Sequence, residues 1–202
     1  GAPLGFFDAV VGGLSVGTPG TPMLLEEAHR RWGTANWSGL FDAAITLADE
    51  GFPTSLRLAK LVTEDAERLA TSDATAAYFL PNGQPLQKGE TLRNPAYADT
   101  LRAMAADGAA AFYSGEIAEG IVAAVRDAAL PGLLSLDDLS AYQVKERDAV
   151  CAPYRGAEVC GMGPPSSGGL TVGQILGMLE PYDIAAMGPD SAEACRLIGD
   201  AS

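Results

Sequence analysis

The sequence predicts an α+β chain that is mostly α-helical and contains a few short strands. Three observations support this fold class. Apolar residues recur at helical spacing in several stretches, the stretches that suit strands are brief, and the 202 residues contain no internal repeat and no long linker. We therefore expect a single domain that covers residues 1–202.

The first elements are expected before residue 33. A short strand near residues 14–16 ends in the tight turn 17–22, which reads GTPGTP. A helix then follows over residues 23–32. Its apolar side consists of Met23, Leu24, Leu25, Ala28 and Trp32.

Two more helices and a strand are expected before residue 84. Ser38 is an expected N-cap for a helix that ends at Gly51. Pro53 suits the first turn of a third helix, which runs to about residue 70. A brief strand near residues 78–80 precedes a Pro-Asn-Gly turn.

The next stretch predicts a pair of helices and a short capped helix. Pro95 suits the first turn of a helix that begins at Asn94 and is broken by Gly108. The helical pattern resumes over residues 109–128. Ser135 begins a short helix with a capping-box-like sequence, SLDD.

The last stretch predicts strands and then helices. Extended segments near residues 144–154 and 157–160 lead into the loop 164–169, which reads PPSSGG, and an apolar helix follows it. A final helix opens at Asp190 or Ser191.

Charge and hydropathy exclude two kinds of partner. The formal net charge is −13, and phosphate binding requires clustered Lys and Arg, so we expect no nucleic-acid partner. No apolar run approaches the roughly 20 residues of a membrane helix, so we expect no membrane span.

The cysteine spacing indicates neither a zinc site nor a disulfide framework. Cys151, Cys160 and Cys195 are odd in number and contain no CxxC pair. Cys151 and Cys160 could be bridged across adjacent strands, but two buried thiols are the favoured interpretation.

The PPSSGG loop resembles a serine active site in composition. A serine nucleophile needs a base within hydrogen-bond reach, and the only histidine, His29, is expected to be a solvated surface residue. The loop also lacks the G-x-S-x-G pattern. We favour a turn in which Ser166 or Ser167 caps the following helix, and leave open an anion or carboxylate bound by amides near Gly168.

Other candidate sites also have ordinary structural explanations. The GTPGTP turn is neither a phosphate loop nor a dinucleotide fingerprint, so we expect no cofactor. Neighbouring acids suit solvated helix faces or helix starts better than a metal site. These pairs are Asp49-Glu50, Glu64-Asp65 and Asp137-Asp138. Three tyrosines with one arginine suit either a small-molecule surface or ordinary core and rim packing. They are Tyr113, Tyr142 and Tyr154 with Arg155.

Five motifs, in order along the chain, resemble the large-subunit region of gamma-glutamyltransferases (gamma-glutamyltranspeptidases). Each motif alone is weak, and the five together at this spacing are specific. The motifs are Gly17-Thr18-Pro19-Gly20, Phe112-Tyr113-Ser114-Gly115, Asp137-Asp138-Leu139-Ser140-Ala141-Tyr142, Tyr154-Arg155-Gly156 and Pro164-Pro165-Ser166-Ser167-Gly168-Gly169. The resemblance covers nearly the whole chain from about Ser15.

The resemblance implies part of an N-terminal-nucleophile hydrolase with an αββα fold. Such a precursor cuts itself and exposes a threonine whose own amine is the general base for its hydroxyl. The threonine takes the gamma-glutamyl group of glutathione or a related amide as an acyl-enzyme. Water or an amino acid then completes hydrolysis or transfer.

The resemblance also implies that the catalytic groups lie elsewhere in the parent protein. The nucleophilic threonine and the oxyanion-hole residues belong to a small subunit downstream of Ser202, and the arginine for the substrate carboxylate lies upstream of Gly1. The threonines of this chain do not match the nucleophile: Thr18, Thr21, Thr91 and Thr171. We expect no catalytic, substrate-binding or metal residue here, no turnover by this chain alone, and an apolar patch that the small subunit covers.

Two alternatives stay open. One is a related acylase that processes cephalosporins or poly-gamma-glutamate. The other is a stand-alone binding module without catalysis.

Overall fold

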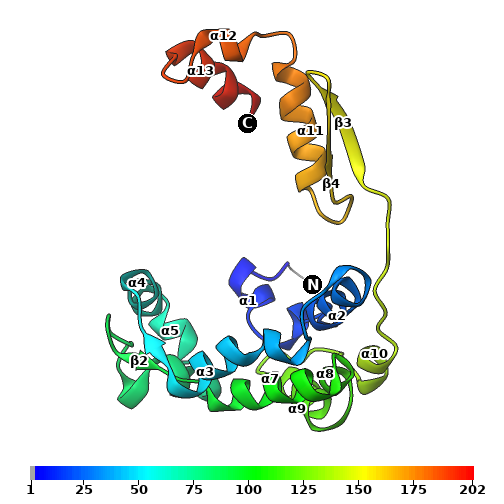
Figure 1. Ribbon diagram of the computed structural model, residues 1–202. Helices are drawn as coiled ribbons and strands as arrows, with labels where there is room; N and C mark the ends of the chain where they lie inside the picture. The colour runs from blue at the N-terminus through cyan, green and yellow to red at the C-terminus, as the bar shows by residue number, and fades with distance from the viewer. Residues whose placement is uncertain (1–2) are drawn as a thin grey trace. The chain divides into compact units, whose positions relative to one another are not determined.

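The structure is a computed structural model that describes residues 3–202, and the chain forms two compact units, Gly1–Val144 and Lys145–Ser202. Helices dominate both units, and the strands form two antiparallel pairs within the described residues (Figure 1). The α+β class, mostly helical with few short strands, is confirmed. The single domain over residues 1–202 stays a prediction. None of the helices described is both long and apolar enough to cross a membrane.

The first unit consists of short helices with one minimal sheet. Its helices and 3-10 turns are α1 Phe6–Val10, η1 Gly13–Ser15, α2 Thr21–Trp32, η2 Ser38–Leu40, α3 Asp42–Glu50, α4 Leu56–Glu64, α5 Ala66–Leu69, α6 Asp73–Phe79, η3 Pro81–Gly83, α7 Pro95–Asp107, α8 Ala110–Tyr113, α9 Gly115–Arg126 and α10 Leu136–Ser140. Glycine and polar caps delimit several of them, as the sequence predicts. Gly51 and Gly108 end α3 and α7 with positive φ, and the Asn94 side chain accepts from the Tyr97 amide.

The small sheet joins the two ends of the segment that contains α4, α5 and α6. Strand β1, Phe52–Pro53, pairs antiparallel with β2, Thr91–Leu92. The segment between these strands folds on itself around one buried cluster. That cluster consists of Val62, Leu80, Leu86 and Leu92. The α4–α6 region therefore has its own apolar core.

A second buried cluster joins α8, α9 and α10. Its members are Ala109, Tyr113, Ala118 and Leu139. The predicted capping box of α10 is confirmed, because the Ser135 side chain accepts from the Asp138 amide and the Asp138 carboxylate accepts from the Ser135 amide. This cap fixes the start of α10, and Leu139 on that helix is fully buried.

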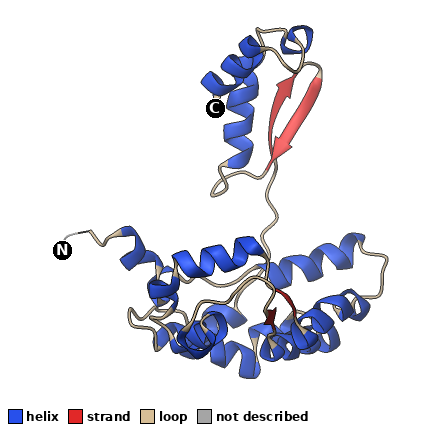
Figure 2. Ribbon diagram, turned by 90° about the vertical axis from the view of Figure 1, so that its left-hand side faces the viewer, coloured by secondary structure: helices blue, strands red, loops and turns tan. Residues whose placement is uncertain are grey.

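The second unit packs a hairpin against helices. Its elements are β3 Val150–Tyr154, β4 Ala157–Gly161, α11 Gly168–Leu179, α12 Ile184–Met187 and α13 Ala192–Ala201. Arg155 and Gly156 both have positive φ, which is the backbone of a two-residue hairpin turn. Helix α11 runs along one face of the hairpin (Figure 2). The Ser191 side chain accepts from the Ala194 amide, so the predicted N-cap of the last helix is confirmed.

Four local predictions are wrong. Residues 14–16 are not a strand, because Gly13–Ser15 forms a 3-10 turn whose Gly13 amide donates to the Leu130 carbonyl oxygen. Residues 78–80 are not a strand either, because the alanine-rich helix α6 continues through Phe79. Pro53 lies in β1 rather than in a helix, at an edge where its missing amide is tolerated. Ser38 begins η2, and α3 starts at Asp42.

Candidate functional site

Three of the five motifs meet in the first unit, around the turn that precedes α2. The Tyr113 hydroxyl donates to the Pro19 carbonyl oxygen at 2.6 Å and accepts from the Met23 amide at 3.4 Å. Tyr113 is 5% exposed and comes from α8. The buried phenol therefore holds the GTPGTP turn at the start of α2.

Tyr142, from the segment after α10, completes this arrangement. Its ring stacks on Tyr113 with centroids 5.7 Å apart and planes 3° apart. A Cβ on Gly20 would lie 2.2 Å from the Tyr142 hydroxyl oxygen, so a side chain here would displace the Tyr142 ring. We call Pro19, Gly20, Tyr113 and Tyr142 the tyrosine cluster. It unites the GTPG, FYSG and DDLSAY motifs, which are more than 120 residues apart at the extremes.

The electrostatics of the tyrosine cluster suit a structural role. Burial raises the pKa of Tyr113 above its usual value of 10, while the Met23 amide acts in the opposite direction. The phenol thus stays neutral at physiological pH and keeps its proton for the Pro19 carbonyl. Its two hydrogen-bond partners are backbone groups, not a nucleophile or base with which it could exchange a proton.

A carboxylate joins α2 to the turn between α7 and α8. Glu26 accepts from the Ala109 amide at 3.2 Å. Gly108 precedes that amide with φ 74°, and a Cβ there would lie 2.2 Å from the Glu26 carboxylate oxygen. Glycine is therefore required for this close approach.

The only histidine, His29, is a surface residue as predicted, but it is half-buried and only partly solvated. Its Nε2 hydrogen-bonds the Ala35 carbonyl oxygen at 2.8 Å, and its ring lies 5.2 Å from that of Trp37. It lines a shallow cavity of about 320 Å³ in the first unit. The cavity is lined by Met23, Glu26, Glu27, His29, Arg30 and Trp37. Among its charged groups, Glu27 accepts twice from Arg30, at 2.7 and 2.8 Å, whereas the Glu26 carboxylate accepts from the Ala109 amide.

The PPSSGG loop lies in the second unit and contains a cis bond between Pro164 and Pro165. Ser167 occupies the N-cap position of α11, but its side chain makes no capping hydrogen bond, so the predicted serine cap is wrong. Ser166 is exposed, and its amide donates to the Gly163 carbonyl oxygen at 3.1 Å. Neither serine has a hydrogen-bonded base among the residues that the structure describes.

Two glycines place the end of β4 against the start of α11. A Cβ on Gly161 would lie 2.7 Å from the Gly169 Cα, and a Cβ on Gly169 would lie 2.8 Å from the Met162 carbonyl oxygen. Side chains at these positions would separate strand and helix. Gly161 and Gly169 therefore serve close backbone packing.

The neighbouring acids have the helix-surface roles predicted for them. Three of the six pair with a cation, and Asp138 closes the capping box. The ion pairs are Asp49–Arg102, Glu64–Lys60 at 3.6 Å and Asp65–Arg68 at 3.0 Å. The three tyrosines for which the sequence leaves open either a small-molecule surface with Arg155 or ordinary packing are divided between the units. Tyr113 and Tyr142 belong to the first, and Tyr154 stacks with the Arg155 guanidinium in the second, 5.0 Å from the ring centroid.

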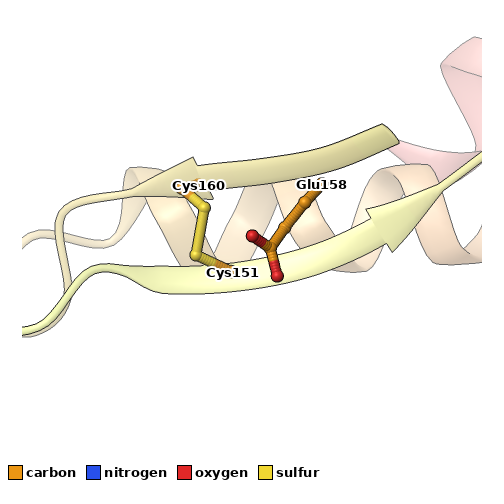
Figure 3. A group of neighbouring side chains, drawn as sticks. All are labelled: Cys151, Glu158 and Cys160. Atoms are coloured by element: carbon orange, nitrogen blue, oxygen red, sulfur yellow. A yellow bond between two sulfur atoms is a disulfide. The ribbon is translucent and has the colours of Figure 1, made fainter. Parts of the chain in front are cut away.

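The interpretation of Cys151 and Cys160 as buried thiols is wrong. They form a disulfide across β3 and β4, with Cα atoms 4.1 Å apart, and both are exposed (Figure 3). The register places them directly opposite each other, which is the geometry of a close, non-hydrogen-bonded antiparallel pair. Cys195 is a free, exposed thiol. Cys151, Cys160 and Glu158 also form the one group of potential metal ligands found among the described residues.

Comparison with known proteins identifies the family. The gamma-glutamyltranspeptidase family model matches residues 5–202. An Acylase ACY 1 proenzyme from Pseudomonas sp. (strain V22) is 38% identical over 95% of this chain and 34% of its own length. The Glutathione hydrolase proenzyme of Escherichia coli (strain K12) is 37% identical over 93% of this chain and 32% of its own length.

A solved structure agrees over almost the whole chain. The crystal structure of Helicobacter pylori gamma-glutamyltranspeptidase superposes on this chain with a TM-score of 0.88 at 32% sequence identity. The match covers 98% of this chain and 56% of the Helicobacter pylori chain. The chain spans about a third of the length of the curated relatives it matches. The meeting of three family motifs in the tyrosine cluster, the family model and the fold agree, and the chain belongs to the gamma-glutamyltranspeptidase family, whose members have the N-terminal-nucleophile hydrolase fold.

Proposed function

We propose that this chain is part of the large-subunit region of a self-processing gamma-glutamyltransferase, and that it supports catalysis without supplying reacting groups. The observation that carries this proposal is the tyrosine cluster. Its family motifs make backbone and ring contacts that hold the start of α2, and none offers an activated nucleophile or base. The span of about a third of the relatives' length agrees with a catalytic part elsewhere in the protein.

The reaction proposed for the intact protein is acyl transfer from a gamma-glutamyl amide such as glutathione. The hydroxyl of an N-terminal threonine outside this chain attacks the amide carbonyl, and the threonine's own amine takes the hydroxyl proton. The C–N bond breaks and the amine portion leaves with a proton. Water or an amino acid then attacks the acyl-enzyme, which releases glutamate or a new gamma-glutamyl amide.

The partner proposed for this chain is the small subunit of the same precursor. Helix α11 is predominantly apolar, with Thr171 and Gln174 as its polar side chains, and Leu170, Val172 and Met178 on it are each about half exposed. A helix of this kind is typical of the interior of a larger protein. The exposed residues support the expectation of an apolar surface that the other subunit covers.

The first test is the sequence of the gene on both sides of these codons. A downstream threonine that opens a strand-rich region, with an upstream arginine in the family's context, is the expected result. A reading frame that ends near Ser202 would instead favour a binding module without catalysis.

The second test is activity. The purified 202-residue protein, made in a host strain that lacks its own gamma-glutamyltranspeptidase, should not hydrolyse a gamma-glutamyl anilide. The longer protein should do so after self-cleavage. Turnover by the 202 residues alone would refute the absence of catalytic groups.

A related acylase is the second candidate, because the Acylase ACY 1 proenzyme is as similar in sequence to this chain as the glutathione hydrolase of Escherichia coli is. The same preparations separate the two functions. Hydrolysis of an N-acyl cephalosporin, without activity on the gamma-glutamyl anilide, would favour the acylase.

A further inference from the structure

The outer face of the β3–β4 hairpin carries an unusual group of side chains. Register pairs Cys151 with Cys160 and Pro153 with Glu158. Alternation along the strands puts these four residues on one face, and all four are exposed. Figure 3 shows the Glu158 carboxylate beside the two sulfur atoms.

The spacing of the potential ligand atoms suits a single metal ion. The two Sγ atoms and a Glu158 carboxylate oxygen all lie within 4.8 Å of one another. Around a four-coordinate Zn²⁺, with Zn–S of about 2.3 Å and Zn–O of about 2.1 Å, neighbouring ligand atoms are separated by roughly 3.5–4 Å. Small side-chain rotations from the present positions would therefore bring the three atoms to one ion once the sulfurs are no longer bonded.

The electrostatics of this face favour a cation. No lysine or arginine that the structure describes forms an ion pair with Glu158. Reduction of the disulfide would place two ionisable thiols beside this carboxylate, and like charges raise thiol pKa values. A divalent ion would relieve that repulsion and bind the thiolates directly.

We propose that the reduced hairpin is a Zn²⁺ site in which Cys151 and Cys160 supply thiolates, Glu158 supplies a carboxylate oxygen, and water completes the tetrahedron. The disulfide and the metal complex are mutually exclusive states of the same residues. Either one links β3 to β4 immediately before the PPSSGG loop. Thiolate ligands select Zn²⁺ over Mg²⁺ and Ca²⁺, which prefer oxygen.

Reduction and metal binding are separate chemical steps. A thiol or phosphine reductant supplies two electrons to the S–S bond, which breaks and gives two thiols with two added protons. Zn²⁺ then displaces both thiol protons, while the carboxylate is already ionised at neutral pH. Binding of one ion should therefore release about two protons.

The test uses Co²⁺ as a spectroscopic probe for Zn²⁺ in a Cys195→Ser background, which removes the remaining thiol. Protein reduced with a phosphine and kept free of oxygen should bind about one Co²⁺ per chain and develop a thiolate-to-cobalt charge-transfer band. Zn²⁺ should abolish the band, whereas Mg²⁺ and Ca²⁺ should not. The same protein with its disulfide intact should show no band.

Two substitutions separate the ligands. Glu158→Gln keeps both thiolates and should retain the band but weaken the affinity at least about tenfold, since even outer partners of a metal ligand cost 10–100-fold. Glu193→Gln, on α13, is the matched control and should bind as the parent does. Cys151→Ser should lose most of the band.

Two comparisons decide between the proposal and its rejection. Equal binding by the reduced and oxidised protein, or an affinity unchanged by Glu158→Gln, would overturn it. Both comparisons preserve the two cysteines, so they do not depend on a cysteine variant that fails to fold. A circular dichroism spectrum of the reduced protein with and without metal shows whether the hairpin is folded in each state.

Discussion

Replacement of Tyr113 by phenylalanine tests whether the tyrosine cluster holds the turn before α2. The substitution removes a 2.6 Å hydrogen bond to the Pro19 carbonyl oxygen and a longer one, at 3.4 Å, from the Met23 amide. It leaves the ring and its stack on Tyr142 in place. The effect therefore isolates the hydroxyl.

The magnitude follows from the quality and burial of these bonds. The longer contact is weak at 3.4 Å, so the bond to Pro19 dominates. A typical hydrogen bond contributes about 1 kcal/mol, and an unsatisfied buried partner costs about 1–3 kcal/mol. Pro19 is only half-buried, so water can reach its carbonyl in part. We expect Tyr113→Phe to lower the free energy of unfolding of the first unit by about 1–2 kcal/mol.

The assay is urea unfolding followed by tryptophan fluorescence. Both tryptophans, Trp32 and Trp37, belong to the first unit, so the signal comes from that unit alone. Tyr142→Phe is the matched control, because the Tyr142 hydroxyl has no side-chain hydrogen bond to a described residue. Its effect should be under about 0.5 kcal/mol. Equal losses in the two variants, or no loss in Tyr113→Phe, would refute the reasoning.

Three further predictions concern other positions. Hydrogen bonds from two arginines lower the pKa of Glu27 to about 2. The contribution of this carboxylate to stability is therefore present above the usual carboxyl pKa near 4.5 and is lost as pH falls toward 2. Glu27→Gln should flatten this acid dependence in thermal unfolding scans at pH 2–5. Gly169→Ala should destabilise the second unit by about 1–3 kcal/mol, because the new Cβ would lie 2.8 Å from a backbone carbonyl oxygen. Gly168→Ala is the control, because the space around Gly168 is open, and it should be neutral or stabilising. Both variants are measured by urea unfolding followed by far-ultraviolet circular dichroism. Asn94→Ala removes the side-chain acceptor of the Tyr97 amide at the start of α7. It should lower the free energy of unfolding of the first unit by about 1 kcal/mol in the tryptophan-fluorescence assay. An unchanged free energy of unfolding would count against this cap.

Helix ends could be predicted from the sequence where a single residue determines them. The positive φ of the glycines after α3 and α7 is a property of the local backbone, and the caps at Asn94 and Ser135 bond amides three residues further along the chain. Short apolar runs could not be assigned in this way. Residues 78–80 suit a strand by composition, but the alanines before them continue a helix through Phe79.

The sequence alone could not decide whether Cys151 and Cys160 pair, because the answer depends on the register set by the hairpin turn. A two-residue turn at Arg155-Gly156 places Tyr154 opposite Ala157, and counting back along both strands places Cys151 opposite Cys160. The necessary information was the positive φ at a non-glycine residue, Arg155, which sequence patterns do not predict. Without that register, two cysteines nine residues apart suit buried thiols equally well.

The tyrosine cluster could not be predicted from local patterns, because its members are distant in sequence and their rings carry no periodic signal. Their order in the family motifs indicated importance but not contact. In the structure, the motif residues act through the stack of Tyr113 on Tyr142, the hydrogen bond from Tyr113 to the Pro19 carbonyl oxygen, and the absence of a side chain at Gly20, where a Cβ would meet the Tyr142 hydroxyl. Contacts of this kind fix where backbone segments lie, and they link the cluster to backbone groups rather than to a catalytic base or nucleophile. We infer that substitutions in the cluster change the stability of the protein and the yield of its processed form, while the Michaelis constant of any correctly processed enzyme stays close to that of the parent.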